Sequence, residues 1–206
     1  QGLAQAVQCF SLPLVGGDLT AGPLSITVTV YGSLPANHGL LRSGARPGET
    51  VLVSGTLGDA AAGLAFLNNE WEPDQADREF LARRFFRPES RLDLASSLLK
   101  IASAAIDISD GLLADIGHIV DVSNVGAIVE FAKVPLSSAG EFAMKAEPML
   151  WKNVVTGGDD YELVFTGPEN LVEKMESSGV PITCIGRIVA GDGVQLVNEQ
   201  KKSLPI

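Results

Sequence analysis

Apolar and polar residues follow two different periods along this chain, and the two periods predict a mixture of strands and helices. Short runs of β-branched and aromatic residues predict strands at 25–31, 50–54, 104–108, 126–131, 162–166, 181–185 and 193–197. Apolar residues that recur every three or four positions predict helices at 59–67, 77–86, 91–102, 112–120, 137–150 and 170–178. The two kinds of element alternate, so the expected fold class is α/β or α+β, with a mixed sheet covered by helices.

The segment 35–48 (PANHGLLRSGARPG) is dense in glycine and proline and separates the first predicted strand from the others. We place a boundary between domains in this segment. The chain begins at Gln1 without a methionine and stops abruptly after the sequence SLPI. We therefore expect a fragment of a longer protein, or a sequence taken from ordered residues.

Composition and charge exclude several classes of protein. The net charge is -10, and lysine and arginine form no stripe, so an extended nucleic-acid interface is not expected. The sequence contains no run of eighteen apolar residues that could span a membrane, and it does not begin with a signal-peptide pattern. By elimination, these features favour a cytoplasmic location.

The first candidate for chemistry is the segment 15–23 (VGGDLTAGP). The paired glycines Gly16 and Gly17 allow the backbone to approach a ligand closely, and the carboxylate of Asp18 suits a hard cation. A tight turn, in which Asp18 bonds to its own backbone, explains the same residues. The local sequence leaves both interpretations open.

The second candidate is the segment 105–115 (AIDISDGLLAD), where a predicted strand leads into a predicted helix. In an extended chain Asp107 and Ser109 share a face, and Asp110 lies at the start of the helix, where negative charge is favoured. The alternative is a helix cap formed by Ser109 or Asp110, with Asp107 in solvent. Two carboxylates this close repel each other unless a cation lies between them, which favours a magnesium–phosphate site.

The third candidate is the segment 156–162 (TGGDDYE), in which three acids follow a glycine pair. A cation or a positively charged substrate would explain the crowding, and so would a solvated acidic loop. Arg42, Arg87 and Arg91 are candidates for holding phosphate, although a surface ion pair is the safer interpretation of an isolated arginine.

Several nucleotide-binding signatures are absent from the sequence. It contains no G-x-x-x-x-G-K-[ST] loop, no G-x-G-x-x-G fingerprint, and no protein-kinase catalytic-loop or D-F-G motif. Phosphoryl transfer would therefore rest on metals held by aspartates and on backbone contacts. Such an arrangement suffices in principle, because this chemistry depends mainly on positioning and charge neutralisation.

Together these segments resemble the thiamine-monophosphate kinase family. Six stretches occur in family order, at 16–32, 40–67, 83–91, 105–119, 156–166 and 184–188. The D-x-S-D-G-L-x-x-D form at 107–115 and the G-G-D-D-Y-E-L form at 157–163 resemble this branch. They differ from its relatives aminoimidazole-ribotide synthetase, selenophosphate synthetase and a hydrogenase-maturation protein.

The resemblance implies a two-domain ATP-binding fold of the aminoimidazole-ribotide-synthetase type that forms a homodimer through its first domain. Residues 1–36 would then be the tail of the N-terminal domain, 37–49 a linker, and 50–206 most of the C-terminal domain. It also implies direct, in-line transfer of a phosphoryl group from ATP to thiamine monophosphate, with several Mg²⁺ ions and no phosphoenzyme.

The resemblance assigns roles to particular residues. It implies ATP contacts at Gly17, Asp18, Arg42 and Ser109, and Mg²⁺ ligands at Asp18, Asp107 and Asp110. It implies that Asp159 contacts the thiamine substrate, at a position where many relatives carry glutamate. A carboxylate there suits a cationic thiazolium or an aminopyrimidine.

The chain departs from the family pattern at both ends. The family carries further metal-binding aspartates before the position of Gln1 and a substrate-stacking aromatic residue beyond Ile206. We therefore expect the 206-residue chain to be inactive alone. Two alternatives remain open: another ATP-dependent synthetase or ligase of the same superfamily, and a non-catalytic fragment that binds nucleotide or dimerises.

Overall fold

A computed structural model describes residues 2–34, 39–175 and 179–205 of the chain. The chain divides into two compact units, Gln1–Ser33 and Leu34–Ile206. The assignment of residues 1–36, 37–49 and 50–206 to a domain tail, a linker and a second domain stays a prediction.

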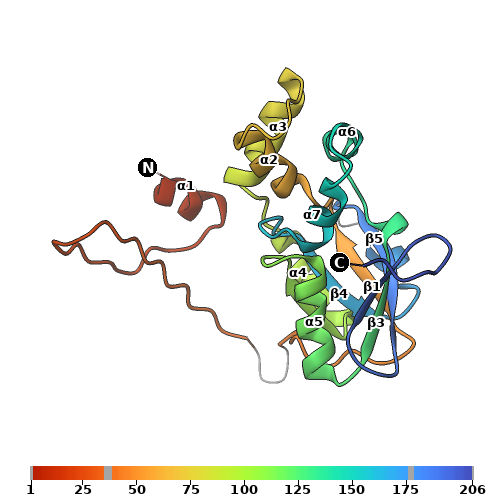
Figure 1. The fold of residues 1–206 in the computed structure, drawn as a ribbon. Coiled ribbons are helices and arrows are strands. Elements are labelled where there is room, and N and C mark those ends of the chain that lie inside the picture. The colour runs from red at the N-terminus through yellow and green to blue at the C-terminus, as the bar shows by residue number, and fades with distance from the viewer. Residues whose placement is uncertain (1, 35–38, 176–178, 206) are drawn as a thin grey trace. The chain divides into compact units, whose positions relative to one another are not determined.

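Over its described residues, 2–33, the first unit contains one regular element, helix α1 (Gly2–Cys9), followed by chain without regular secondary structure (Figure 1). The strand predicted at 25–31 is therefore wrong. Ile26 and Val28 are 83% and 67% exposed. Alternating β-branched residues favour an extended backbone, but a strand also needs a neighbouring chain to accept its hydrogen bonds. Among the described residues this segment pairs with no strand.

The second unit is built on one six-stranded sheet in the order β2-β4-β1-β5-β3-β6. Neighbouring strands are antiparallel except for β3 and β6, which are parallel. The strands are β1 (Thr50–Ser54), β2 (Ala104–Asp107), β3 (Gly126–Glu130), β4 (Leu163–Gly167), β5 (Ile182–Val189) and β6 (Val194–Val197). The predicted α/β class with a mixed sheet is confirmed.

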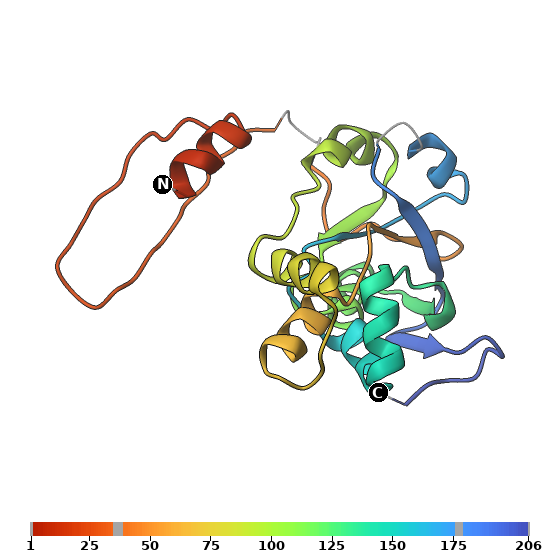
Figure 2. The ribbon, with the colours of Figure 1, turned by 90° about the horizontal axis from the view of Figure 1, so that it is seen from above.

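Helices flank this sheet, as two perpendicular views show (Figures 1 and 2). They are α2 (Asp59–Leu67), α3 (Gln75–Phe86), α4 (Leu92–Ile101), α5 (Leu112–Ser123), α6 (Ser138–Ala146), α7 (Leu150–Thr156) and α8 (Leu171–Met175), with a short 3₁₀ turn η1 (Phe131–Lys133). None of the helices in the described ranges has the length and apolar composition needed to cross a membrane.

The single helix predicted at 137–150 is two helices, α6 and α7. Pro148 lies in the break, where it lacks a backbone N–H and disfavours helical geometry at the preceding Glu147. The helix predicted at 170–178 is α8 over its described part, and residues 176–178 lie outside the described residues.

The core lies on both faces of the sheet. Val51 and Val53 of β1 belong to a buried cluster with Ile116 of α5, whereas Leu52 belongs to a second cluster with Leu98 of α4. This double burial explains why β1 is a continuous apolar run. A third cluster joins the helices around the β1–α2 turn through Ala62, Ala65, Trp71, Leu81, Ala139, Ala143 and Leu150.

Candidate functional site

The second and third candidate segments of the sequence lie side by side in the structure. Beyond the paired strands β2 and β4, backbone hydrogen bonds continue the ladder into both loops. They run from Ile108 N to Glu162 O at 2.7 Å, from Tyr161 N to Ile108 O at 2.9 Å, and from Asp159 N to Ser109 O at 3.1 Å. We call residues 107–111 and 157–162 together the acidic edge.

The glycines of the acidic edge permit this close packing of its two segments. A Cβ atom at Gly158 would lie 2.0 Å from the carbonyl oxygen of Ser109. A Cβ atom at Gly111, whose φ is 121°, would lie 2.7 Å from the carbonyl oxygen of Thr156. These glycines are thus required by the neighbouring backbone itself, before any ligand is considered.

Asp115 organises the loop that follows β2. Its Oδ2 accepts hydrogen bonds from the backbone N–H groups of Ser109 (3.0 Å), Asp110 (3.0 Å) and Gly111 (3.1 Å). Burial raises the pKa of this carboxyl, and the three N–H groups partly oppose the rise. Asp110, Asp115 and His118 bring potential ligand atoms within 4.8 Å of one another.

The cap expected at the start of α5 is therefore different from the alternative drawn from the sequence. Neither Ser109 nor Asp110 caps the helix, because the N-cap residue is Gly111, without a side-chain bond. Asp115, inside the helix, instead reaches back to the N–H groups of the residues that precede it, and the side chain of Asp110 is exposed. Asp107, at the end of β2, is exposed as well.

The three acids of the third segment have two different environments. Asp159 is exposed, while Asp160 and Glu162 are buried. The carboxylate of Asp160 accepts hydrogen bonds from Gly58 N at 2.7 Å and Ala60 N at 3.2 Å, so it caps helix α2 from a distant part of the chain. Burial raises the pKa of Asp160 to about 7, against the opposing effect of these N–H groups.

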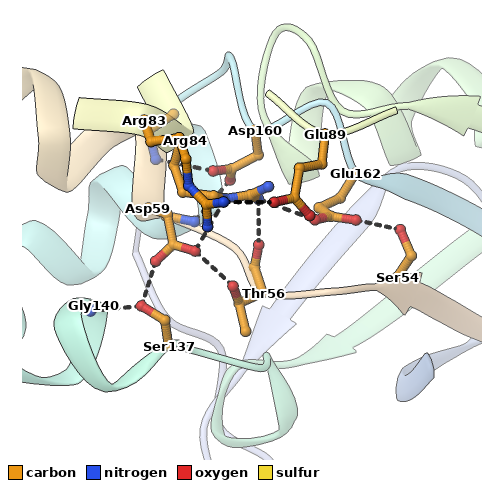
Figure 3. Close-up of polar contacts among 12 residues, drawn as sticks. Ser54, Thr56, Asp59, Arg83, Arg84, Glu89, Ser137, Gly140, Asp160 and Glu162 are labelled. Atoms are coloured by element: carbon orange, nitrogen blue, oxygen red, sulfur yellow. Dashed lines mark hydrogen bonds and ion pairs between the residues drawn. The ribbon is translucent and has the colours of Figure 1, made fainter. Parts of the chain in front are cut away.

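Glu162 is neutralised by two arginines in a buried network (Figure 3). Arg91 donates to it from two nitrogens, Nε to Oε2 at 2.6 Å and Nη2 to Oε1 at 2.5 Å, and Arg84 Nη2 donates to Oε1 at 3.0 Å. Ser54 Oγ donates to Oε2 at 2.6 Å. Arg91 thus pairs with a buried glutamate. The sequence suggested a phosphate ligand or a surface ion pair for this residue, and neither interpretation included this buried partner.

The exposed carboxylates gather around Tyr161. Burial raises the pKa of its phenol, followed by the charge of Asp159 and a hydrogen bond with it, and then by the charges of Asp107 and Asp110. The acidic edge therefore exposes three carboxylates whose charges all act on the Tyr161 phenol. Carboxylate oxygens are ligands that Mg²⁺ prefers.

Two hollows adjoin the acidic edge. An open depression of about 520 Å³ is lined by Arg42, Ser43 and Asp107, among others. A second hollow of about 160 Å³ is lined by Asp159, by Asn153 of α7 and by several residues of α2, among others. The structure thus places a cationic side chain beside one exposed aspartate and a smaller hollow beside another.

Gly17 and Asp18 belong to the first unit of the chain, whereas Arg42, Asp107, Ser109, Asp110 and Asp159 belong to the second. Asp18 Oδ1 accepts a hydrogen bond from the backbone N–H of Leu19 at 2.8 Å, in a segment that has no regular turn. The roles of Gly17 and Asp18 in binding ATP or metal stay predictions.

Sequence reasoning missed the buried members of this region. Asp115 carries a readable signal, because an acid in the first turns of a helix can reach back to the N-terminal N–H groups. Arg84 carries no local signal, since its partner Glu162 is 78 positions away. Asp160 and Glu162 were visible only as part of an acidic run.

Comparison with known proteins now adds independent information. Residues 46–198 match the family described as AIR synthase related protein, C-terminal domain. The thiamine-monophosphate kinase of Escherichia coli K12 is 43% identical over 187 residues, which are 88% of this chain and 57% of the relative. The thiamine-monophosphate kinase of Haemophilus influenzae is 39% identical over 202 residues, covering 91% of this chain and 58% of the relative.

Solved structures agree with these relatives. Thiamine-monophosphate kinase from Stenotrophomonas maltophilia matches with a TM-score of 0.74 at 37% identity, over 83% of this chain and 56% of that one. A structure of AaThiL complexed with AMPPCP and TMP matches with a TM-score of 0.69 at 36% identity, over 81% of this chain and 52% of that one. The chain thus spans little more than half the length of the proteins it matches.

The raised pKa of Asp160 predicts a pH-dependent contribution to stability. The folded state holds this proton more tightly than the unfolded state, whose value is near 3.8, so the contribution is full below that pH and is lost as the pH rises through about 7. Relative to the non-titrating variant Asp160→Asn, the parent chain should lose about 3 kcal/mol of unfolding free energy between pH 5 and pH 8. Urea unfolding at both pH values measures this, with the exposed Asp121→Asn as control; a pH-independent difference for Asp160→Asn would contradict it.

The close contact at Gly158 predicts that a single methyl group will separate the two segments of the acidic edge. Gly158→Ala should lower the unfolding free energy by about 1–3 kcal/mol, because the added carbon meets backbone that cannot rotate away. Gly117→Ala on α5 is the matched control, since no atom lies within 4 Å of its added carbon. Equal urea midpoints for the two variants would show that the segments are not tightly packed.

Proposed function

We propose a function on the premise that this chain belongs to the AIR synthase related family, whose C-terminal domain it matches over residues 46–198. The protein transfers the γ-phosphoryl group of ATP to thiamine monophosphate and forms ADP and thiamine diphosphate. The observation that carries this proposal is the acidic edge, which exposes Asp107, Asp110 and Asp159 together beside two hollows. Relatives named thiamine-monophosphate kinase support the choice of reaction.

On the ATP side, the chain supplies ligands for metal and phosphate. Asp107 and Asp110 would hold Mg²⁺, which neutralises phosphate charge and fixes the phosphates when bound. Ser109 lies between these two aspartates and would contact the nucleotide. Arg42 lines the depression beside Asp107, where its guanidinium can hold phosphate oxygens at two points.

On the acceptor side, Asp159 is the exposed acid of the third segment and lines the smaller hollow. Thiamine carries a positively charged thiazolium ring and an aminopyrimidine with N–H donors. An exposed carboxylate attracts the first and accepts hydrogen bonds from the second. The AaThiL structure, described as a complex with AMPPCP and TMP, supports the pairing of an ATP-like ligand with this acceptor.

The reaction requires no nucleophilic side chain. The acceptor phosphate attacks the γ-phosphorus in line, and the protein contributes position and charge neutralisation.

The proposal further includes a two-domain protein that forms a homodimer in the cytoplasm. In it, residues 1–36 form the tail of the N-terminal domain, with Gly17 and Asp18 at the ATP site and Asp18 also binding Mg²⁺. Residues 37–49 form a linker, and residues 50–206 most of the C-terminal domain.

The proposed activity is tested with the product of the complete reading frame that encodes this chain. The protein is incubated with MgATP and thiamine monophosphate, and the products are separated by chromatography. We expect thiamine diphosphate and ADP in equal amounts, and their loss when the metal is chelated. A folded protein that binds ATP without forming thiamine diphosphate would reject the assignment and direct the search to other acceptors used in the superfamily.

The metal role of Asp107 predicts a loss of activity without a loss of stability. Since loss of even an outer partner of a metal site typically costs about 10–100-fold, we expect Asp107→Asn to lower turnover by at least about 100-fold. Its unfolding free energy should stay within about 0.5 kcal/mol of the parent value, because the side chain is exposed and its removal relieves repulsion. Asp121→Asn, an exposed aspartate in the last turn of α5, is the matched control. Near-normal turnover by Asp107→Asn would refute the assignment.

A further inference from the structure

Two acids of the acidic edge, Asp160 and Glu162, belong to a largely buried group of charged side chains that has no part in the proposed chemistry. We call Asp59, Arg84, Asp160 and Glu162 (Figure 3), together with the partly exposed Arg91, the buried ion cluster. Arg84 is only 4% exposed, and the carboxylates of Asp59 and Glu162 are fully buried. The cluster connects helix α3, the β1–α2 turn and the start of β4.

Arg84 is the bridge within the cluster. Its Nη2 donates to Glu162 Oε1 at 3.0 Å and to the carbonyl oxygen of Thr56 at 3.3 Å, and its Nε lies 3.4 Å from Asp59 Oδ2. Asp59 is itself held by the hydroxyl groups of Thr56 at 2.6 Å and Ser137 at 2.5 Å. One guanidinium thus connects the β1–α2 turn to Glu162, the last residue of the acidic edge.

The loop that this bridge holds has an unfavourable backbone conformation. Asp159 and Tyr161 have φ values of 67° and 51°, in the left-handed region that non-glycine residues rarely adopt. The buried acids Asp160 and Glu162 alternate with these two residues along the chain. Asp160 is bonded to the start of α2, and Glu162 is bonded to the two arginines. Strained backbone of this kind persists only where surrounding contacts fix it.

Stability alone is a weak explanation for the buried ion cluster. Replacing buried ion pairs with apolar residues of similar size is often neutral or stabilising, because removing charges from water is costly. Apolar contacts have no preferred direction, whereas hydrogen bonds and ion pairs hold the groups that make them in a defined orientation. The buried acids on either side of Tyr161 fix the part of the loop that leads into β4. The exposed carboxylate of Asp159, next to this fixed part, lines the smaller hollow.

We propose that Arg84 is a positioning residue for the acceptor site: by bridging Asp59 and Glu162, it holds residues 159–161 so that the Asp159 carboxylate faces the hollow. Arg84 does not touch substrate in this arrangement. The inference rests on the proposed function for its kinetic consequence, but the bridge and its effect on the loop are independent of the reaction.

Arginine suits this task better than lysine. Its planar fork offers several N–H groups in fixed directions, so it reaches both carboxylates and the Thr56 carbonyl at once. A lysine at position 84 would keep the positive charge but offers a single nitrogen. Arg84→Lys therefore keeps the positive charge but loses the bridge between the two carboxylates, and Arg84→Met loses both.

The first measurement is hydrogen exchange in the product of the complete reading frame, read by mass spectrometry on peptides that contain residues 157–163. The amides of Asp159 and Tyr161 are bonded to Ser109 and Ile108, so they report directly on the loop. We expect both Arg84 variants to exchange about tenfold faster there, with strand β3 unchanged. Arg83→Met, which removes a 58%-exposed arginine next in sequence, is the control and should leave exchange unaltered.

The second measurement is steady-state kinetics on the same proteins. We expect Arg84→Lys to raise the KM for thiamine monophosphate about tenfold while the KM for ATP changes less than about twofold, because only the acceptor loop is displaced. If Arg84→Met does not fold, Arg84→Lys carries both measurements.

Two results would overturn the proposal. One is loop exchange and kinetics of Arg84→Lys that match those of Arg83→Met. The other is an equal rise in both KM values with general loss of protection, which would make Arg84 a support for the whole fold. A parent protein that forms no thiamine diphosphate, yet shows faster loop exchange in Arg84→Lys, would reject the proposed function and leave the bridge established.

Discussion

The site depends on how the fold divides its carboxylates between two environments. Asp160 and Glu162 are taken into the interior, where backbone N–H groups and arginines compensate them. Asp107, Asp110 and Asp159 stay exposed at the end of the same two strands. The buried carboxylates are thus compensated by nearby N–H groups and arginines. The surface keeps an unbalanced negative charge that a cation or a cationic ring would relieve.

The sheet supplies the geometry for this division. β2 and β4 are antiparallel neighbours, so the end of one strand meets the beginning of the other, and their loops extend the pairing. Residues fifty positions apart thus reach one edge without a dedicated scaffold. Gly111 and Gly158 allow that close approach. Asp115 accepts hydrogen bonds from three N–H groups of the loop that follows β2. The exposed side chains are consequently placed by backbone contacts, which hold them more rigidly than side-chain contacts in solvent would.

Local pattern was sufficient for most elements of the second unit. The apolar run of β1 and the helical spacing of α2 and α5 are properties of neighbouring residues, so the sequence predicts them directly. The strand at 25–31 failed because pairing depends on a second chain segment. The boundary between α6 and α7 was missed although Pro148 marks it. In the site, the sequence predicts Asp107 and Asp110 as metal ligands, and that role stays a prediction. The buried partners of Glu162 come from distant parts of the chain, so the local sequence does not reveal them.

The cap on helix α2 has a consequence for how the molecule is made. Gly58 offers no side chain at the start of this helix, and the carboxylate that caps it belongs to Asp160, 102 residues later. During synthesis, residues 59–67 therefore emerge well before the carboxylate that caps their helix. The cap of the helix forms only when the loop carrying Asp159 and Asp160 is in place, so capping α2 and positioning Asp159 are linked in folding.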